Sequence, residues 1–192
     1  QCIIDPRDNQ IQYSSTQNGS IVRTTDAWAN TFVNVSNNIG DGKLKGAWVT
    51  PYFLDPNDSK TLYVGYDEIW KSTDRGDSFT KISSFGVGLN LQEMAIAESN
   101  SNYIYAYDQL FLYVTKDGGT TWVSSINNEV TLPDSDLVTD IEVDHKNPEK
   151  LWITYGNYDA QRVFESNDAG KTWVDISAGL PPIPTLDIIQ RD

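Results

Sequence analysis

One short pattern recurs along the chain and restricts the possible folds more than any other feature. A Ser or Thr is followed after two residues by Asp, after two more by Gly, and after three more by an aromatic residue, in 72–79, 115–122 and 166–173. A looser copy in 24–32 has one extra residue and places Trp28 where Gly is expected. The carboxylate accepts hydrogen bonds from its own turn, Gly supplies a positive φ, and the aromatic ring packs onto the sheet. We therefore interpret each copy as a stapled hairpin turn, here called a staple.

The staples lie within runs of sequence that are typical of β-strands. Short stretches of aromatic and β-branched residues alternate with Asn, Asp, Gly, Pro and Ser, and no stretch has a helical period of useful length. Each repeat is predicted to be a four-stranded meander with the staple between its third and fourth strands. Ten residues are assigned a structural role in these staples: Asp26, Asp74, Gly76, Phe79, Asp117, Gly119, Trp122, Asp168, Gly170 and Trp173.

The spacing of the staples predicts an all-β propeller. Successive staple aspartates are 48, 43 and 51 residues apart, which is in the range of propeller blades. The predicted repeats are approximately 1–46, 47–90, 91–136 and 137–184, and 185–192 would begin a fifth repeat. Four blades and one strand fit a closed four-bladed ring or an arc of a larger propeller. An end within a repeat favours the arc, and Gln1 at the start indicates processing or a longer parent chain with further blades.

Composition excludes several classes of partner. The 192 residues include 14 basic and 27 acidic side chains, for a net charge of −13, which argues against binding nucleic acid or an anionic membrane surface. No apolar run approaches the ~18 residues of a membrane span, so no membrane insertion is expected. A single cysteine, Cys2, and a single histidine, His145, leave no cysteine metal cluster and no His-rich zinc site. We expect no metal and no cofactor.

At the level of a family, the staple resembles the Asp-box, or BNR, repeat. This repeat occurs in sialidases, sortilin-type receptors, xyloglucanase-like glycoside hydrolases and photosystem assembly propellers. The longer string from Leu54-Asp55-Pro56 to Ser72-Thr73-Asp74 looks like the repeat of secreted bacterial members, and the resemblance covers essentially the whole chain. It implies a propeller fold, an extracellular, cell-surface or periplasmic location, and staples that face away from any active site.

The resemblance also allows enzyme classes to be tested residue by residue. A sialidase would need three converging arginines and a Phe/Tyr-Arg-Ile-Pro motif, and this chain has five scattered arginines and no such motif, so we reject this class. A xyloglucanase-like hydrolase would use two acidic residues in a cleft. Carboxylates are plentiful, but no pair aligns with a catalytic motif, so no catalytic residue is assignable from the sequence.

The loops opposite the staples are the expected place for ligand binding. A Tyr-Asp dipeptide recurs there in three repeats, as Tyr66-Asp67, Tyr107-Asp108 and Tyr158-Asp159. A tyrosine ring for stacking beside a carboxylate for hydroxyl groups would suit a carbohydrate. The dipeptide could equally recur without a ligand, because Asp favours turns and Tyr favours strand ends. Trp48, on a long loop, is a further candidate sugar platform, with packing at the rim as its alternative.

These observations favour a secreted, non-catalytic propeller module for binding or scaffolding, with carbohydrate as the preferred ligand class. One alternative is a fragment of a xyloglucanase-like glycoside hydrolase whose cleft is completed by other blades. A second alternative is a protein-docking propeller of the sortilin or assembly-factor type. Facing carboxyls with a raised pKa would favour the hydrolase, and an open row of aromatic rings would favour the carbohydrate module.

Overall fold

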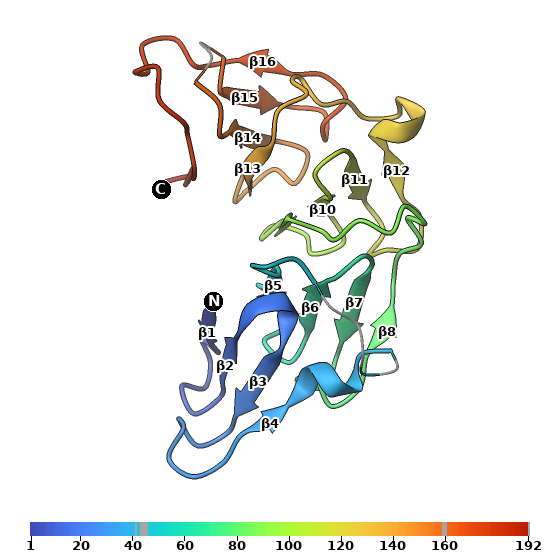
Figure 1. The fold of residues 1–192 in the computed structure, drawn as a ribbon, viewed down its shortest axis with the longest axis vertical. Helices are drawn as coiled ribbons and strands as arrows, with labels where there is room; N and C mark the ends of the chain where they lie inside the picture. Colours follow the sequence, from blue (N-terminus) through green and yellow to red (C-terminus); the bar gives the residue numbers. More distant parts are fainter. Residues whose placement is uncertain (41, 43–45, 159–160, 192) are drawn as a thin grey trace. The chain divides into compact units, whose positions relative to one another are not determined.

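The fold is all-β. The computed structural model describes residues 1–40, 42, 46–158 and 161–191, and in these residues sixteen strands form four sheets of four strands each (Figure 1). Short 3-10 turns cover Gln17–Gly19, Val35–Asn38 and Ser125–Asn127. None of the described segments is a helix with the length and apolar character needed to cross a membrane.

The strands are short and follow the predicted repeats. The first two sheets contain β1 (Cys2–Ile4), β2 (Gln12–Ser15), β3 (Ile21–Thr24), β4 (Val33–Asn34), β5 (Tyr52–Leu54), β6 (Leu62–Gly65), β7 (Ile69–Ser72) and β8 (Thr80–Lys81). The other two contain β9 (Glu93–Ile96), β10 (Ile104–Tyr107), β11 (Leu112–Thr115), β12 (Val123–Ser124), β13 (Val138–Val143), β14 (Leu151–Tyr155), β15 (Val163–Ser166) and β16 (Val174–Asp175).

Each sheet is an antiparallel meander in which consecutive strands are neighbours. Its two ends therefore differ. One end carries the staple, which joins the third and fourth strands, together with the turn between the first and second strands; we call it the staple end. The opposite end carries the loop between the second and third strands and the connection to the next sheet; we call it the loop-bearing end. The predicted all-β meander of four strands per repeat is confirmed.

The chain divides into two compact units, which we call unit 1 (1–92) and unit 2 (93–192). In each unit two neighbouring sheets share one hydrophobic core. In unit 1 the core includes Tyr13 from the first sheet and Leu62 from the second, both almost completely buried. In unit 2 it includes Tyr105 from the third sheet and Ile153 from the fourth. Burial of one face against a neighbouring sheet supplies the apolar contact that a lone sheet of short strands lacks.

The staple aspartates accept hydrogen bonds from both sides of their turns. Asp74 accepts bonds from the Ser72 hydroxyl at 2.7 Å, the Ser78 amide at 2.8 Å and the Ser78 hydroxyl at 2.6 Å. Asp117 and Asp168 make the same three kinds of contact with the matching residues of their own turns. The Ser72 hydroxyl also accepts a bond from the Gly76 amide at 2.7 Å, so the turn is closed twice.

The looser staple of the first sheet keeps these bonds but not the packing. Asp26 accepts hydrogen bonds from the Thr24 hydroxyl and from two amides. Ala27 and Trp28 both have positive φ, as do Arg75 and Gly76 in the second sheet, so Trp28 adopts the left-handed position that is a glycine in the other staples. The extra residue lies after Trp28, where Asp26 accepts bonds from the amides of both Asn30 and Thr31. The ring of Phe32 is 66% exposed, whereas Phe79 packs against the core of unit 1.

The C-terminal segment differs from its prediction. Residues 185–191 form no strand, although 185–192 was expected to begin a fifth repeat. The segment runs beside β13 and is held mainly by side-chain acceptors: the Ile188 amide donates to Asp140 at 2.9 Å and the Gln190 amide to Glu142 at 3.2 Å. These contacts replace backbone pairing, so the described residues 185–191 form no strand, and a fifth repeat beginning at 185–192 stays a prediction. Asp192 lies outside the described residues.

Candidate functional site

Two of the predicted tyrosines have no exposed ring face. Tyr66 and Tyr107 are each about 1% exposed, and their hydroxyls donate to the Gly19 and Gln109 carbonyl oxygens, both at 2.7 Å. A stacking role requires an accessible face. The ligand-binding prediction for Tyr66 and Tyr107 is therefore corrected to a packing role in the cores of units 1 and 2.

Asp108 also has partners within the protein. Its carboxylate accepts hydrogen bonds from the Leu110 and Phe111 amides and from the Tyr113 hydroxyl at 2.7 Å, and the residue is buried. A carboxylate with three internal donors shapes its own loop, as expected for Asp at a turn. The ligand-binding prediction for Asp108 is corrected in the same way.

The other predicted ligand residues differ in exposure. Asp67 is half-buried, and Tyr158 is 76% exposed on the loop that follows β14. Asp159 lies outside the described residues. Tyr158 and Trp48 thus present accessible rings, and Asp67, Tyr158 and Trp48 remain predictions.

Trp48 lies at the edge of a small hollow at the loop-bearing end of unit 1. The hollow has a volume of about 330 Å³, and its lining includes Ser15, Thr16, Gln17 and Val49. The indole is 68% exposed, while its backbone carbonyl accepts a bond from the Asn18 amide at 3.4 Å. An exposed aromatic ring on an anchored backbone, beside hydroxyl and amide groups, matches the chemistry that binds sugars.

A larger groove opens at the loop-bearing end of the third sheet. It has a volume of about 530 Å³ and lies between the β10–β11 loop and the connection from β12 to β13. Its lining includes the exposed Leu110, together with Asn128, Leu132, Asp134 and Asp136. The groove therefore combines apolar contacts with carboxylate and amide groups.

Three carboxyl groups of unit 2, those of Glu93, Asp140 and Asp187, interact at this same end, and none of them was predicted from the sequence. Glu93 is the first residue of β9 and is paired with Tyr107, so both side chains project from the same face of the third sheet. Tyr107 packs in the core shared with the fourth sheet. Glu93 therefore faces β13, which carries Asp140 next to a register shift between Val138 and Asp140. Such a bulge redirects side chains locally.

The environment of these carboxyls changes their acidity. Burial raises the pKa of Glu93 to about 8, and the charges of Asp140 and Asp187 add to the rise. Burial raises the pKa of Asp140 to about 6, and a hydrogen bond with Asp187 acts in the same direction, although amide bonds from Ile188 and Ile141 lower it. Glu93 is thus protonated at neutral pH, while Asp140 and Asp187 form one interacting pair.

A sequence signal for this group exists but is weak. Asp140 interrupts an apolar strand, and Glu93 begins one, but neither position belongs to a repeated motif. Among the residues that the structure describes, no set of three or more His, Cys, Asp or Glu side chains is arranged to hold a metal ion.

The chain is similar to xyloglucanases. It is 26% identical over 185 residues to a xyloglucanase of Hypocrea jecorina, a match that covers 88% of this chain and 19% of that protein. It is 27% identical over 205 residues to a xyloglucanase of Acetivibrio thermocellus, with 90% and 24% covered. The chain thus spans about a fifth to a quarter of these relatives. No family model matches it.

Solved structures agree on the architecture. The crystal structure of the GH74 xyloglucanase from Xanthomonas campestris superimposes with a TM-score of 0.71 at 18% identity, over 94% of this chain and 30% of that one. The chain has a β-propeller fold. At this identity the similarity establishes the propeller fold alone.

Proposed function

We propose that this chain is part of a propeller glycoside hydrolase that acts on xyloglucan or a related β-glucan. The observation that carries the proposal is the similarity to xyloglucanases along about nine-tenths of the chain. This similarity supports the hydrolase alternative better than the non-catalytic module that the sequence analysis preferred. The relatives are four to five times longer, which supports further propeller sheets in the parent protein. An extracellular location and a staple of the Asp-box type belong to the same proposal.

We place the polysaccharide on the loop-bearing ends of the sheets. Exposed Trp48 beside Gln17 in unit 1, and the groove bordered by Leu110 and Asp134 in unit 2, offer apolar surfaces next to polar groups. A glucan chain presents apolar ring faces and equatorial hydroxyls, and it requires both kinds of contact. The staple ends present turns whose carboxylates are engaged internally, so they are less suited to sugar hydroxyls.

Glu93 is the candidate proton donor. Glycoside hydrolysis needs one carboxylic acid to protonate the leaving oxygen and one carboxylate to stabilise or activate the attacking group. A pKa of about 8 keeps Glu93 protonated at neutral pH, as a general acid requires. Asp140 and Asp187 share a hydrogen bond and are too close together to flank a sugar as the two separate catalytic groups. We assign that pair to the carboxylate role opposite Glu93.

The proposal is tested with xyloglucan oligosaccharides and this chain. Binding is followed by isothermal titration calorimetry, and hydrolysis by release of reducing ends. Trp48→Ala should weaken binding by about tenfold, because stacking of a sugar on an indole contributes about 1–2 kcal/mol. Trp28→Ala is the matched control, since Trp28 is also exposed but lies in the staple of the first sheet. Equal losses of affinity in Trp48→Ala and Trp28→Ala would show that Trp48 does not belong to the binding site.

Glu93→Gln separates binding from catalysis. If the chain releases reducing ends, this variant should keep affinity and lose release at least a hundredfold, the usual contribution of a general acid. Binding without release in the unaltered chain would return the assignment to a carbohydrate-binding module. Absence of binding to xyloglucan, with an α-linked glucan as the reference, would refute the proposal for this chain.

A further inference from the structure

A second concentration of charge lies at the staple end of unit 1. A hollow of about 500 Å³ is lined there by three cationic side chains, Arg23, Lys60 and Arg75, and by Asp74 and Asp77. The chain has 14 basic and 27 acidic residues, so three cations around one hollow depart from its general charge. Both carboxylates already have partners: Asp74 faces the donors of its own staple, and Asp77 contacts Arg23.

Both arginines use only part of their hydrogen-bonding capacity. Arg23 donates through Nη1 to the Arg75 carbonyl oxygen at 2.7 Å, and its Nη2 lies 3.0 Å from Asp77. Arg75 contacts Asp5 through Nη2 at 3.4 Å. In each guanidinium the buried Nε–H, which lies on the same edge as Nη2, has no acceptor. The Nε–Nη2 edge of a guanidinium can bind two oxygens of one anion, and in Arg23 and Arg75 only the Nη2 of that edge has an acceptor.

An unsatisfied buried N–H is unfavourable and calls for a bound ion or water. Two such groups belong to arginines that line one hollow. Each arginine contacts a single carboxylate, Asp77 at Arg23 and Asp5 at Arg75. An oxyanion would satisfy the remaining N–H groups with charge-assisted bonds, because carboxylate, sulfate and phosphate groups each offer two oxygens to a guanidinium edge.

The staple turn itself does not require a charged side chain at Arg75. Arg75 has φ of +64°, and the matching residues of the other three sheets, Ala27, Gly118 and Ala169, have φ of +51°, +71° and +61°. The second sheet alone places a guanidinium at this position of the turn.

We propose that the hollow between Arg23, Lys60 and Arg75 binds the oxyanion group of a small ligand, a carboxylate, sulfate or phosphate. This site lies at the staple end, outside the surface assigned to polysaccharide, and it is independent of the proposed hydrolase activity. The incoming anion takes the Nε–Nη2 edge of Arg23 and the Nε–H of Arg75, whose Nη2 keeps its contact with the buried Asp5, and the Lys60 ammonium contributes charge. Asp77, whose side chain is 64% exposed, competes for Arg23 and turns toward solvent when the anion binds.

The binding test uses the 192-residue chain with three separate probes: sodium sulfate, inorganic phosphate and glucuronate. Glucose serves as the uncharged counterpart of glucuronate, and sodium chloride fixes the ionic strength. Arginine Nε–Hε resonances are recorded in a 15N-correlated NMR spectrum, because they report directly on the two unpaired groups. Saturable shifts of the Arg23 and Arg75 resonances are expected with at least one probe. The most effective probe identifies the kind of oxyanion.

Three variants distinguish a specific site from general charge attraction. Arg75→Gly copies the residue of the third sheet and should lower affinity about tenfold or more, because a charge-assisted hydrogen bond contributes about 1.5–3 kcal/mol. Arg23→Lys retains the charge but removes the Nε–Hε edge, and it should weaken binding similarly. Asp77→Asn removes the competing carboxylate and should strengthen binding several-fold.

Arg7→Gln is the matched control, since Arg7 contacts the Asn57 carbonyl oxygen and does not line the hollow. It removes the same charge and should leave affinity within about twofold. Circular dichroism confirms that each variant is folded. Absence of a saturable shift with all three probes, or equal effects of Arg7→Gln and Arg75→Gly, would overturn the proposal.

Discussion

Units 1 and 2 are built from the same repeat but place their unusual charges at opposite ends of their sheets. In unit 1, Arg23 and Arg75 meet beside a buried Asp5 at the staple end. In unit 2, Glu93 and Asp140 interact at the loop-bearing end, and the positions that match Arg75 are the uncharged Gly118 and Ala169. The hydroxyl–Asp contacts of the staples are the same in both. The repeat therefore fixes a framework, and the residues outside it are free to give each unit its own chemistry.

Among the substitutions that test this difference between the units, Glu93→Gln is expected to change the free energy of unfolding the most. A carboxyl whose pKa is raised on folding contributes most to stability while it is protonated, below its ordinary value of 4.5. That contribution is lost as the pH rises through about 6 for Asp140 and about 8 for Glu93. Glu93→Gln should therefore be more stable than the unaltered chain at pH 9, by on the order of 3 kcal/mol, and nearly equal to it at pH 4.

The measurement is urea unfolding at both pH values. Glu98→Gln is the control, because Glu98 belongs to the same sheet region and is exposed. Its stability should follow that of the unaltered chain at both pH values. A Glu93→Gln variant with no pH-dependent difference would show that burial does not raise the pKa of Glu93, and the contrast with unit 1 would disappear.

The next effect concerns the packing of the staple. Gly76 has φ of +93°, and a Cβ atom there would lie 2.9 Å from the Val35 Cβ atom. Gly76→Ala should lower the free energy of unfolding by about 2–3 kcal/mol, from backbone strain and overpacking together. Gly86 has φ of +71° but open space around its Cβ position, so Gly86→Ala should lose only about 1 kcal/mol.

The same substitution in unit 2 extends this test. A Cβ atom on Gly170 would lie 3.0 Å from Leu112 Cδ2, and this aliphatic side chain can shift more easily than a Cβ atom. The loss of unfolding free energy in Gly170→Ala, measured by urea unfolding, should therefore lie between the losses in Gly86→Ala and Gly76→Ala. A loss at Gly86 as large as that at Gly76 would show that backbone strain alone sets these values.

The repeat explains why the fold was predictable from the sequence. Strand order, four strands per sheet and the position of the staples follow from local patterns in which each staple Asp has hydrogen-bond donors within its own turn. The exceptions are long-range. Residues 185–191 have a strand-like composition, but their amides donate to Asp140 and Glu142, so side chains replace the ladder that the pattern predicted.

The candidate site was less predictable because its residues depend on contacts between sheets. Tyr66 and Tyr107 recur beside Asp in the sequence, yet register and packing direct both rings into cores. Glu93 and Asp140 carry no repeated motif, and their interaction depends on β9 lying beside β13. Trp48 and Tyr158 are exposed, as their prediction assumed, because both lie on loops outside the cores.

A smaller effect is expected when a staple carboxylate is removed. Asp74→Ala loses three hydrogen bonds at a largely exposed turn and should lower stability by about 1–2 kcal/mol at pH 7, with xyloglucan binding unchanged. Bonds from Ser78 and Ser72 hold the pKa of Asp74 at about 2. This stabilisation is present above pH 4 and is lost as the pH falls toward 2. An unchanged melting temperature of Asp74→Ala at pH 7 would contradict the staple role.

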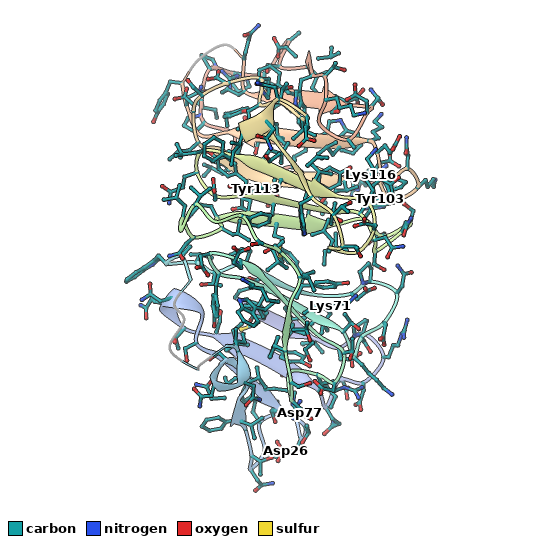
Figure 2. All side chains as sticks on the ribbon, turned by 90° about the vertical axis from the view of Figure 1, so that its right-hand side faces the viewer. Asp26, Lys71, Asp77, Tyr103, Tyr113 and Lys116 are labelled. Carbon is teal, nitrogen blue, oxygen red and sulfur yellow. The ribbon has the colours of Figure 1, made fainter. Side chains whose placement is uncertain are left out.

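The smallest effect is expected for the ion pair between Lys116, in the staple of the third sheet, and Glu149 of the fourth sheet. Lys116 Nζ contacts Glu149 of the fourth sheet and lies 5.5 Å from the centroid of the Tyr103 ring, next to which it is labelled in Figure 2. Both charged side chains are about 40% exposed, so water and salt screen the pair. Lys116→Gln should change the free energy of unfolding by about 0.5 kcal/mol or less, and 0.5 M salt should abolish the difference. A loss of more than about 1 kcal/mol that persists in 0.5 M salt would show that this ion pair contributes substantially to the stability of unit 2.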